Sequence, residues 1–349
     1  MHTHLIKNAK LWLESKAIEQ LGYVSQLPGV ITAVGMPDLH PGRNAPVGMA
    51  FATKNLIYPS LIGPDIGCGY ACFLVSGVTN FEKLAKKARF FDPVDYQSKF
   101  LVPEAAPWTE QFCTLGLGNH FIEIGQCVSG PYKGQYILTI HCGSRNYGMQ
   151  VLQATLAKAH EAGLTAESAI GQDYLKNHNY AVEWAKLNRI ALAKALAFHL
   201  NLELELLCNT VHNYVELTEI NKVPIAIHRK GCNNAYGLNF IAGSRGTSSY
   251  LVEPINTLSS LHSLPHGCGR KYNRGEMQSR GRDLLEGSDK SRLGATHIIC
   301  NKKDLLYEEH PFAYKSIDQI MTCLEEHKLI KSELSSEIEP RLNYKTIEG

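Results

Sequence analysis

The chain has 349 residues, of which 44% are hydrophobic and 19% charged, with a formal net charge of +2. This composition excludes a wholly disordered chain and supplies enough apolar side chains for a substantial core. No run approaches the roughly 20 apolar residues of a membrane span and no apolar signal segment is present near Met1, so we expect a cytoplasmic protein without a membrane partner.

The distribution of charged and cysteine residues is more informative than their totals. Between Arg270 and Lys303, nine Lys or Arg residues stand against four Asp or Glu. Such an excess is typical of a solvated basic face and equally of a surface that binds nucleic acid. The ten cysteines are irregularly spaced and form no CxxC pair, which predicts mostly buried, reduced thiols and no disulfide framework.

The first part of the chain predicts one helix followed by strands. The spacing of apolar residues from Asn8 to Leu21 suits an amphipathic helix that Gly22 would end. Apolar β-type runs at residues 30–34, 47–52 and 72–75 then alternate with Pro and Gly clusters, which indicates strands joined by tight loops.

The remaining elements are mixed. We expect a strand at residues 136–140, helices at 150–160 and 182–207, strands at 223–227, 239–242 and 249–252, and helices that close the chain from about Ser316. No internal repeat, low-complexity tract or linker separates these elements. The pattern predicts an α+β fold.

A carboxylate and a thiol lie three residues apart in the segment Pro64-Asp65-Ile66-Gly67-Cys68-Gly69-Tyr70. The two glycines let the backbone turn tightly, so that both side chains can point into one small space. A segment of this kind is weak evidence by itself, because a simple turn with a buried cysteine has the same sequence.

Three histidines strengthen the case for a metal site: His120, His141 and His212 each lie next to a strand or a Gly-rich turn. Together with Asp65 and Cys68 they form a suitable ligand set for a dinuclear metal centre with a bridging thiolate.

The other histidines are interpreted differently. We expect surface or packing roles for His160, His178 and His199, and a frayed terminus around His2 and His4. For His40, in Met36-Pro37-Asp38-Leu39-His40-Pro41-Gly42, a role toward the substrate together with Asp38 and a purely structural turn both remain open.

A further histidine stands in Leu264-Pro265-His266-Gly267-Cys268-Gly269-Arg270. Pro and Gly on its two sides would expose the imidazole at a turn, and Arg270 follows four residues later. This arrangement suits a nucleophile that attacks phosphorus while a guanidinium holds the phosphate oxygens, although a Gly-rich turn with an uninvolved histidine explains it as well.

In eight segments the chain resembles the RtcB family of RNA ligases, which join RNA 3′-phosphate or 2′,3′-cyclic phosphate ends to 5′-hydroxyl ends. The segments occur in the family's order between Met36 and Lys315, and are DIGCG, GLGNHFIEI, HCGSR, HNY, HRKG, AGSRGTSSY, PHGCGR and Ala313-Tyr314-Lys315. Each alone proves little, whereas eight in order are specific.

The resemblance implies a role for each matching residue. Ligands of two Mn²⁺ ions, with Cys68 shared by both, would be Asp65, Cys68, His120, His141 and His212. The catalytic pair would be His266, which carries GMP, and Arg270. Positions that match the family's GMP contacts are Asn119, Glu123, Ser244, Ser249, His266, Arg270 and Lys315.

The resemblance also implies the reaction and the fold. GTP would guanylylate His266, GMP would pass to the RNA 3′-phosphate, and the 5′-hydroxyl would then displace GMP. The expected fold is one domain over residues 1–349, built of stacked mixed β-sheets flanked by helices. RNA phosphates would lie along residues 270–292 and at Arg145 and Arg229.

The chain departs from the family pattern in several places. It is shorter than typical members, Asn209-Thr210-Val211 lacks the histidine usual before His212, and Ala242, Arg245 and Cys142 replace a usual proline, methionine and serine. Its compact form resembles most closely the subgroup associated with peptide release factor H, which suggests ribosomal RNA as a substrate. The alternatives are a metal-dependent 2′,3′-cyclic phosphodiesterase or phosphatase that does not seal, and a non-catalytic RNA-binding partner of translation.

Overall fold

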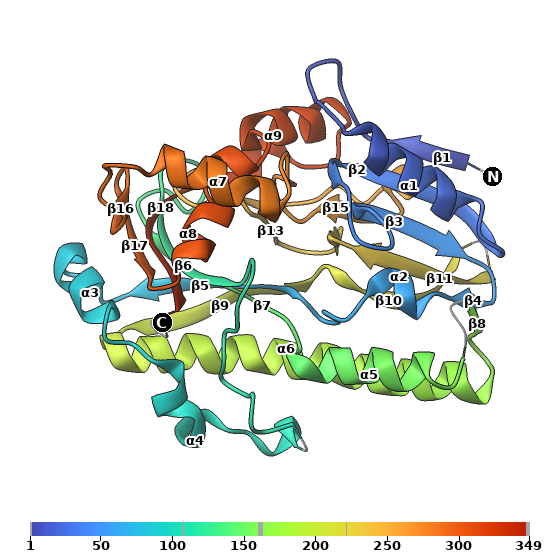
Figure 1. Ribbon diagram of the computed structural model, residues 1–349, viewed down its shortest axis with the longest axis horizontal. Coiled ribbons are helices and arrows are strands. Elements are labelled where there is room, and N and C mark those ends of the chain that lie inside the picture. Colours follow the sequence, from blue (N-terminus) through green and yellow to red (C-terminus); the bar gives the residue numbers. More distant parts are fainter. Residues whose placement is uncertain (1, 107, 160–162, 221, 347–349) are drawn as a thin grey trace.

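The structure, a computed structural model, describes residues 2–106, 108–159, 163–220 and 222–346. In these residues two large β-sheets are flanked by helices (Figure 1). Most strand pairs are antiparallel, while β1 with β2 and β17 with β18 run parallel. The predicted α+β class is confirmed.

The first large sheet has five strands within the described residues, in the order β1-β2-β3-β11-β10. Their bounds are β1 (His2–Leu5), β2 (Val30–His40), β3 (Val47–Thr53), β11 (Val223–Lys230) and β10 (Asn213–Ile220). Helix α1 (Ser15–Ser25) covers it through Leu21 and Val24. The expectation of a frayed terminus is wrong for His4, which pairs with Val34 of β2.

The predicted bounds of the first helix are also wrong. The side chain of Asn8 accepts hydrogen bonds from the backbone N–H groups of Lys10 and Leu11 and closes a turn, so the helix begins only at Ser15. At the other end, Gly22 lies inside the helix, which continues to Ser25.

The second sheet has the strand order β13-β14-β18-β6-β7-β5-β9 in the part of the chain that the structure describes, with β17 beside β18 and β16 beside β17. The bounds are β13 (Asn239–Ile241), β14 (Ser249–Val252), β18 (Ser336–Thr346), β6 (Phe121–Cys127), β7 (Tyr136–Cys142), β5 (Gly69–Ser76), β9 (Glu203–Val211), β16 (Arg292–Leu293) and β17 (Thr296–Cys300).

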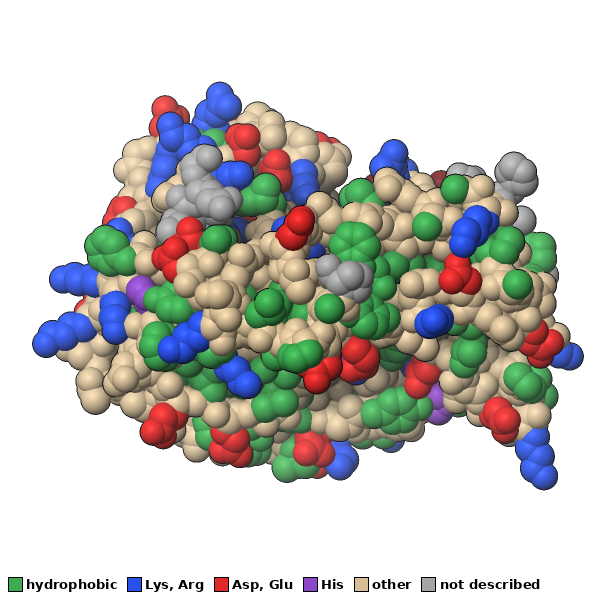
Figure 2. Space-filling view, turned by 90° about the horizontal axis from the view of Figure 1, so that it is seen from below, with side chains coloured by type: hydrophobic (Ala, Val, Ile, Leu, Met, Phe, Trp, Pro, Cys, Tyr) green, Lys and Arg blue, Asp and Glu red, His purple; other side chains and the backbone are tan. Residues whose placement is uncertain are grey.

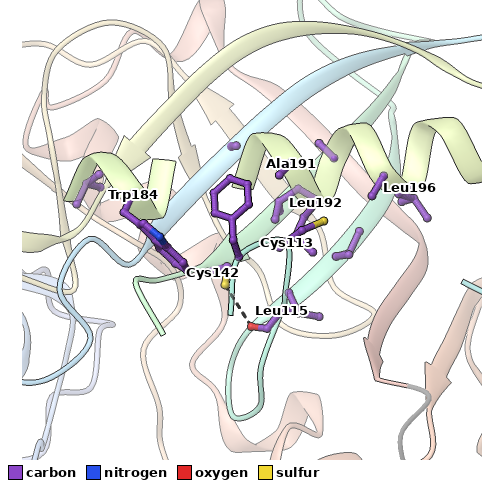
Figure 3. Packing of buried hydrophobic residues seen from close by; sticks show 14 of the residues in the cluster. Cys113, Leu115, Cys142, Trp184, Ala191, Leu192 and Leu196 are labelled. Atoms are coloured by element: carbon purple, nitrogen blue, oxygen red, sulfur yellow. Dashed lines mark hydrogen bonds between the residues drawn. The ribbon is translucent and has the colours of Figure 1, made fainter. Parts of the chain in front are cut away.

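One face of this sheet is covered by α6 (Ala169–Leu200), which lies with α5 (Asn146–Leu156) along the lower side of Figure 1. Trp184, Leu192 and Leu196 of α6 pack into the core near Cys142 of β7 (Figure 3). The surface on the side of α5 and α6, seen in Figure 2, carries side chains of both charges mixed with apolar ones.

The sequence placed this helix at residues 182–207, and both ends differ. It begins at Ala169, capped by Ser168, and ends at Leu200 because Asn201 adopts the left-handed conformation with φ 59°. The next segment alternates Leu and Glu from Leu202 to Leu206, a period of two that suits a strand. It forms the start of β9, which pairs with β5.

The remaining elements are short or lie near the C-terminus. They are β4 (Leu56–Ile57) with β8 (Leu164–Thr165), β12 (Cys232–Asn234) with β15 (Ser263–Pro265), and the helices α2 (Pro59–Ile62), α3 (Phe81–Ala88), α4 (Gln97–Phe100), α7 (Arg274–Leu284), α8 (Lys303–Glu308) and α9 (Ile317–Glu326). Only α9 fits the expected closing helices. The segment Ser336–Thr346 instead forms β18, in the centre of the second sheet.

Several other predictions are confirmed. Strands occur at each β-type run named above, and a helix overlaps residues 150–156; His160 lies outside the described residues. All ten cysteines are free, and eight of them are buried. His178 is buried, and its Nε2 accepts from the backbone N–H of Val215, which is a packing role. Separately from these predictions, no helix among the described residues is long and apolar enough to cross a membrane.

Candidate active site

One cavity of about 280 Å³ lies where the two large sheets meet, and most of the predicted site residues line it. These are Asp65, Cys68, Asn119, Glu123, His141, His212, Ser244, Ser249, His266 and Arg270. His120 and Lys315 are not among the lining residues, but His120 contacts Asp65 and Cys68, which are.

Cys68 is the centre of a cluster of metal-binding side chains. Two groups share it, Cys68 with His141 and His212, and Cys68 with Asp65 and His120, and within each group the ligand atoms lie within 4.8 Å of one another. The Sγ atom of Cys68 is 3.3 Å from Nε2 of His141 and 3.5 Å from Nε2 of His120. The five predicted ligands therefore come together as two sites that meet at one thiol.

Hydrogen bonds on the far side of the rings orient the histidines. Nδ1 of His120 is 3.1 Å from the carbonyl oxygen of Leu115, and Nδ1 of His141 is 3.1 Å from that of Asn119. Each Nδ1–H thus donates to a carbonyl, which directs the Nε2 atom of each ring at the thiol. Burial opposes protonation of His120, but Cys142, Asp65 and Cys68 outweigh it and hold the pKa of His120 well above its usual value. The loop before β6 is held in turn by the Sγ of Cys142, which contacts the carbonyl oxygen of Leu115 (Figure 3).

The glycines beside the ligands are required by close contacts. A Cβ atom at Gly69 would lie 1.9 Å from the carbonyl oxygen of Thr210, and one at Gly143 would lie 2.0 Å from Oδ1 of Asp65. Gly67 has φ +77° and approaches α6. Any larger side chain at these positions would displace a segment that carries a ligand.

Arg189 of α6 ties the ligand segments together and was missed in the sequence. It is fully buried, and its guanidinium donates to the backbone carbonyls of Gly67, Cys142 and Thr210, at 2.8, 2.7 and 3.3 Å. Each carbonyl lies one or two residues from a predicted ligand. No sequence signal marks Arg189, because an arginine in a long helix is normally solvated.

The electrostatics of the cluster fit a metal centre. Burial and the nearby Asp65 raise the pKa of the Cys68 thiol to about 12, so it needs a cation to ionise. Burial opposes ionisation of Asp65, but His120 outweighs it and lowers the pKa of Asp65 to about 2. Burial and neighbouring histidines hold the pKa of His141 and His212 well below the usual value, which keeps both rings neutral, as metal ligands must be.

His266 stands directly beside this cluster, its ring centroid 4.8 Å from that of His212. Its Nδ1 is 2.7 Å from Oδ2 of the buried Asp38, which also accepts from the backbone N–H of His266. The carboxylate accepts the Nδ1 proton, so Nε2 keeps its lone pair on the side of the cavity. The sequence left open whether the segment around Asp38 and His40 acts toward the substrate or is a purely structural turn. The contact of Asp38 with His266 supports a role toward the substrate.

His40 also lines the cavity, and its Nδ1 is 2.9 Å from the backbone carbonyl of Asp38. Burial lowers its pKa to about 4, so the ring is neutral near pH 7.

Charged side chains of β6 and β18 also line the cavity. Glu123 accepts a hydrogen bond of 3.0 Å from Asn343, its partner in the strand pair, and burial raises its pKa to about 7. Lys345 donates to the carbonyl oxygens of Gly118 and His120, at 2.7 and 3.2 Å. Burial lowers its pKa to about 8.

Two predicted residues are engaged differently from the expectation. The ammonium of Lys315 donates to the carbonyl oxygens of Pro37 and Leu39, whereas the lysines among the residues that line the cavity are Lys230 and Lys345. The guanidinium of Arg270 faces Glu309, Tyr314 and backbone carbonyls. Asn343 and Lys345, two apart on a strand, could have been recognised only if the last segment had been read as β.

The expected RNA contact of Arg229 is wrong. Its side chain is fully buried and bonded to Glu216, Tyr214 and Ser263. Arg145 remains partly exposed, with its guanidinium over Gly116 and its Nε 3.3 Å from the Thr114 hydroxyl.

Comparisons with known proteins show which family the chain is similar to. A family model described as tRNA-splicing ligase RtcB matches residues 20–92 and 91–346. RNA-splicing ligase RtcB2 of one Escherichia coli strain is 35% identical over 340 residues, with 91% of this chain and 89% of that protein covered. RNA-splicing ligase RtcB of Escherichia coli K12 is 28% identical over 388 residues, with 90% and 92% covered. A homologue of Entamoeba dispar is 24% identical over 430 residues, with 88% and 80% covered.

Proposed function

Because this chain belongs to the tRNA-splicing ligase RtcB family and is an RNA ligase, we propose that it joins RNA 3′-phosphate or 2′,3′-cyclic phosphate ends to 5′-hydroxyl ends, using GTP and two Mn²⁺ ions. One observation carries the proposal: the ring of His266, held by Asp38, faces a cavity that also contains two ligand groups joined at Cys68.

The donor set supports two divalent ions. One site would use Asp65, Cys68 and His120, and the other Cys68, His141 and His212. Bound there, the ions would neutralise phosphate oxygens and orient the triphosphate. Thiolate and imidazole ligands would favour zinc by affinity alone, so the choice of Mn²⁺ rests on the family.

The first step uses the lone pair of His266. Nε2 attacks the α-phosphorus of GTP, so that a P–N bond forms while the P–O bond to pyrophosphate breaks. The ring gains positive charge during the attack, and the carboxylate of Asp38 at 2.7 Å stabilises it.

The guanylyl group then passes to an oxygen of the RNA 3′-phosphate, which restores free His266. The 5′-hydroxyl attacks that phosphorus, a 3′,5′-phosphodiester forms, and GMP leaves. A 2′,3′-cyclic phosphate must first be hydrolysed to a 3′-phosphate.

Guanine would be read at the β6–β18 end of the cavity. The carboxylate of Glu123 can accept from N1–H and the N2 amino group, while an ammonium can donate to O6. Lys315 does not line the cavity, and Lys230 lies on the other large sheet, so we assign the ammonium to Lys345, on the strand beside Glu123. Its Nζ donates to two carbonyl oxygens and lies 4.0 Å from Glu309, which leaves one N–H for the base. Ser244, Ser249 and Asn119 line the cavity nearby and would hold the rest of GMP.

RNA would approach over the start of α7. The rings of Tyr272 and Phe312 stack with centroids 5.3 Å apart, the guanidinium of Arg280 lies 4.5 Å from the Tyr272 centroid, and Lys271 lies 4.8 Å from the Phe312 centroid. Phe312 is exposed and Tyr272 partly exposed, and accessible aromatic rings among cations bind single-stranded nucleic acid by stacking and charge. This pair lies two residues from Arg270 and Tyr314, which line the cavity.

The physiological setting is proposed from the resemblance alone. The substrate would be a cleaved RNA of translation, such as ribosomal RNA handled alongside release factor H, in the cytoplasm. Sequencing of RNA ends in nuclease-stressed cells that lack the protein tests this. Absence of accumulated 2′,3′-cyclic phosphate ends in ribosomal RNA would contradict it.

The decisive experiment for the reaction is incubation with α-labelled GTP and Mn²⁺, followed by denaturing electrophoresis. We expect an acid-labile, base-stable label on the protein that His266→Ala abolishes. Full labelling of His266→Ala would place the nucleophile elsewhere. A protein that opens cyclic phosphates without taking up label would instead be the phosphodiesterase alternative, and one with neither activity would be a binding protein.

A further inference from the structure

Arg245 is a buried cation in the wall of the cavity that the proposed reaction leaves without a role. It is only 7% exposed and lines the cavity next to Ser244. Among the described residues its hydrogen bond runs from Nη2 to the carbonyl oxygen of Leu305, at 3.4 Å, and its Nε is buried without a partner.

An arrangement of this kind is costly unless a ligand completes it. A buried donor without an acceptor loses its hydration, and the cost is larger for a charged group. A guanidinium stays protonated under these conditions, so Arg245 cannot avoid the cost by becoming neutral. An acceptor-rich ligand in the cavity would offset the cost of burying this charge by pairing with the guanidinium.

The neighbours of Arg245 indicate which part of a ligand it meets. Glu123, Glu309 and Lys345 line the same cavity, and the charges of Glu123 and Lys345 interact electrostatically with that of Arg245. In the proposed complex Glu123 reads N1 and N2 of guanine and Lys345 reads O6. The next atom along the edge of the base is N7, a pure acceptor, and an arginine donates well to N7 and O6 together.

We propose that Arg245 donates to N7 of the guanine base and is a specificity residue of this chain, an inference that rests on the proposed use of GTP. The position normally holds methionine in proteins that the chain resembles, and methionine has no donor. With arginine at this position, the chain would make one more hydrogen bond to the base than a chain with methionine there.

Equilibrium binding separates this contact from the chemistry of the reaction. The intact protein with Mn²⁺ is titrated by calorimetry with GMP, 7-deaza-GMP, which has carbon in place of N7, and IMP, which lacks the N2 amino group. We expect wild type to bind 7-deaza-GMP roughly tenfold or more weakly than GMP, the effect of one hydrogen bond to a charged donor. Arg245→Met should bind both with one weakened affinity, and IMP should bind weakly to both proteins.

Each alternative outcome is distinct. Equal affinity of wild type for GMP and 7-deaza-GMP overturns the contact with N7, and this is the result expected if Arg245 pairs with the phosphate instead. Discrimination between the two ligands that persists in Arg245→Met overturns the contact as well. No binding of GMP together with no labelling from GTP overturns the proposed function as well. Thermal denaturation checks that Arg245→Met is folded, and the comparison of ligands in wild type tests the contact even if the variant does not fold. The matched control is Arg89→Met, which replaces an exposed arginine.

Discussion

Replacement of Asp38 by asparagine should slow guanylylation while the metal centre stays intact. Asp38 is fully buried, and its Oδ2 lies 2.7 Å from Nδ1 of His266. Asparagine keeps the shape but removes the charge. Its amide group can also donate to Nδ1, which would move the ring proton to Nε2 and remove the lone pair that attacks phosphorus.

The magnitude follows from the charge that develops on the ring. A carboxylate and an imidazolium whose charges lie about 4 Å apart attract each other by about 4 kcal/mol at an effective dielectric constant near 20. Since the His266 side chain is 14% exposed, part of that attraction is replaced by water. Because each 1.36 kcal/mol corresponds to about a factor of ten, we expect a rate lower by roughly 10² to 10³.

The assay is single-turnover labelling from GTP at saturating Mn²⁺, together with Mn²⁺ titration and thermal melting of the same samples. Asp38→Asn should keep the Mn²⁺ affinity and melting temperature of wild type. Asp173→Asn, which removes an exposed ion pair with Lys158, is the matched control and should label at the wild-type rate. A labelling rate of Asp38→Asn within threefold of wild type would refute the reasoning, and so would a loss explained by weaker Mn²⁺ binding.

Four further outcomes test other parts of the site. Burial raises the pKa of Glu123 to about 7, although Asn343 and Arg245 lower it, and only the ionised carboxylate accepts both hydrogen bonds from guanine. The affinity for GMP, measured by calorimetry, should therefore rise roughly tenfold from about pH 6 to about pH 8. A similar rise in Glu123→Gln would contradict this. Mn²⁺ should support sealing and Zn²⁺ should inhibit it, and sealing by Zn²⁺ alone after metal stripping would overturn the assignment. RNA binding should fall steeply with salt, and Phe312→Ala should weaken it roughly tenfold with labelling from GTP unchanged; binding independent of salt would point to another surface. Arg189→Met should lower stability by about 3 kcal/mol or more and weaken Mn²⁺ binding, since three buried carbonyls lose their donor; wild-type melting would show that these carbonyls find other partners.

The predicted residues that the structure brings together lie in short contiguous motifs. Asp65 and Cys68 are three residues apart, and the glycines around them report a tight turn, so their meeting can be inferred from local geometry. The ligand histidines follow because each lies at or next to the end of a strand. The other predicted site residues were assigned from the order of the eight motifs. The two ligand groups around Cys68 agree with that assignment.

The residues that the sequence did not predict act across long separations. Lys315 follows a recognisable motif, but a motif does not say which way a side chain points, and Lys345 lines the cavity from a strand that was expected to be helical. Arg229 counted as a candidate because it is basic, and only burial shows that it is structural. The bond between Asp38 and His266 spans 228 residues, a pairing that no local pattern can indicate.

The position of the cavity explains why these long-range contacts matter. Asp38 belongs to the five-stranded sheet, whereas Cys68 and His141 belong to the nine-stranded sheet or the turn before it. His212 lies between β9 and β10, where the chain passes from one sheet to the other, and its backbone N–H donates to the carbonyl of Cys68. Its ring contacts His141 on one side and His266 on the other. The distance between His266 and the candidate metal ligands is therefore set by the docking of the two sheets, so we propose that residues 1–349 act as one catalytic domain in which neither sheet alone forms the site.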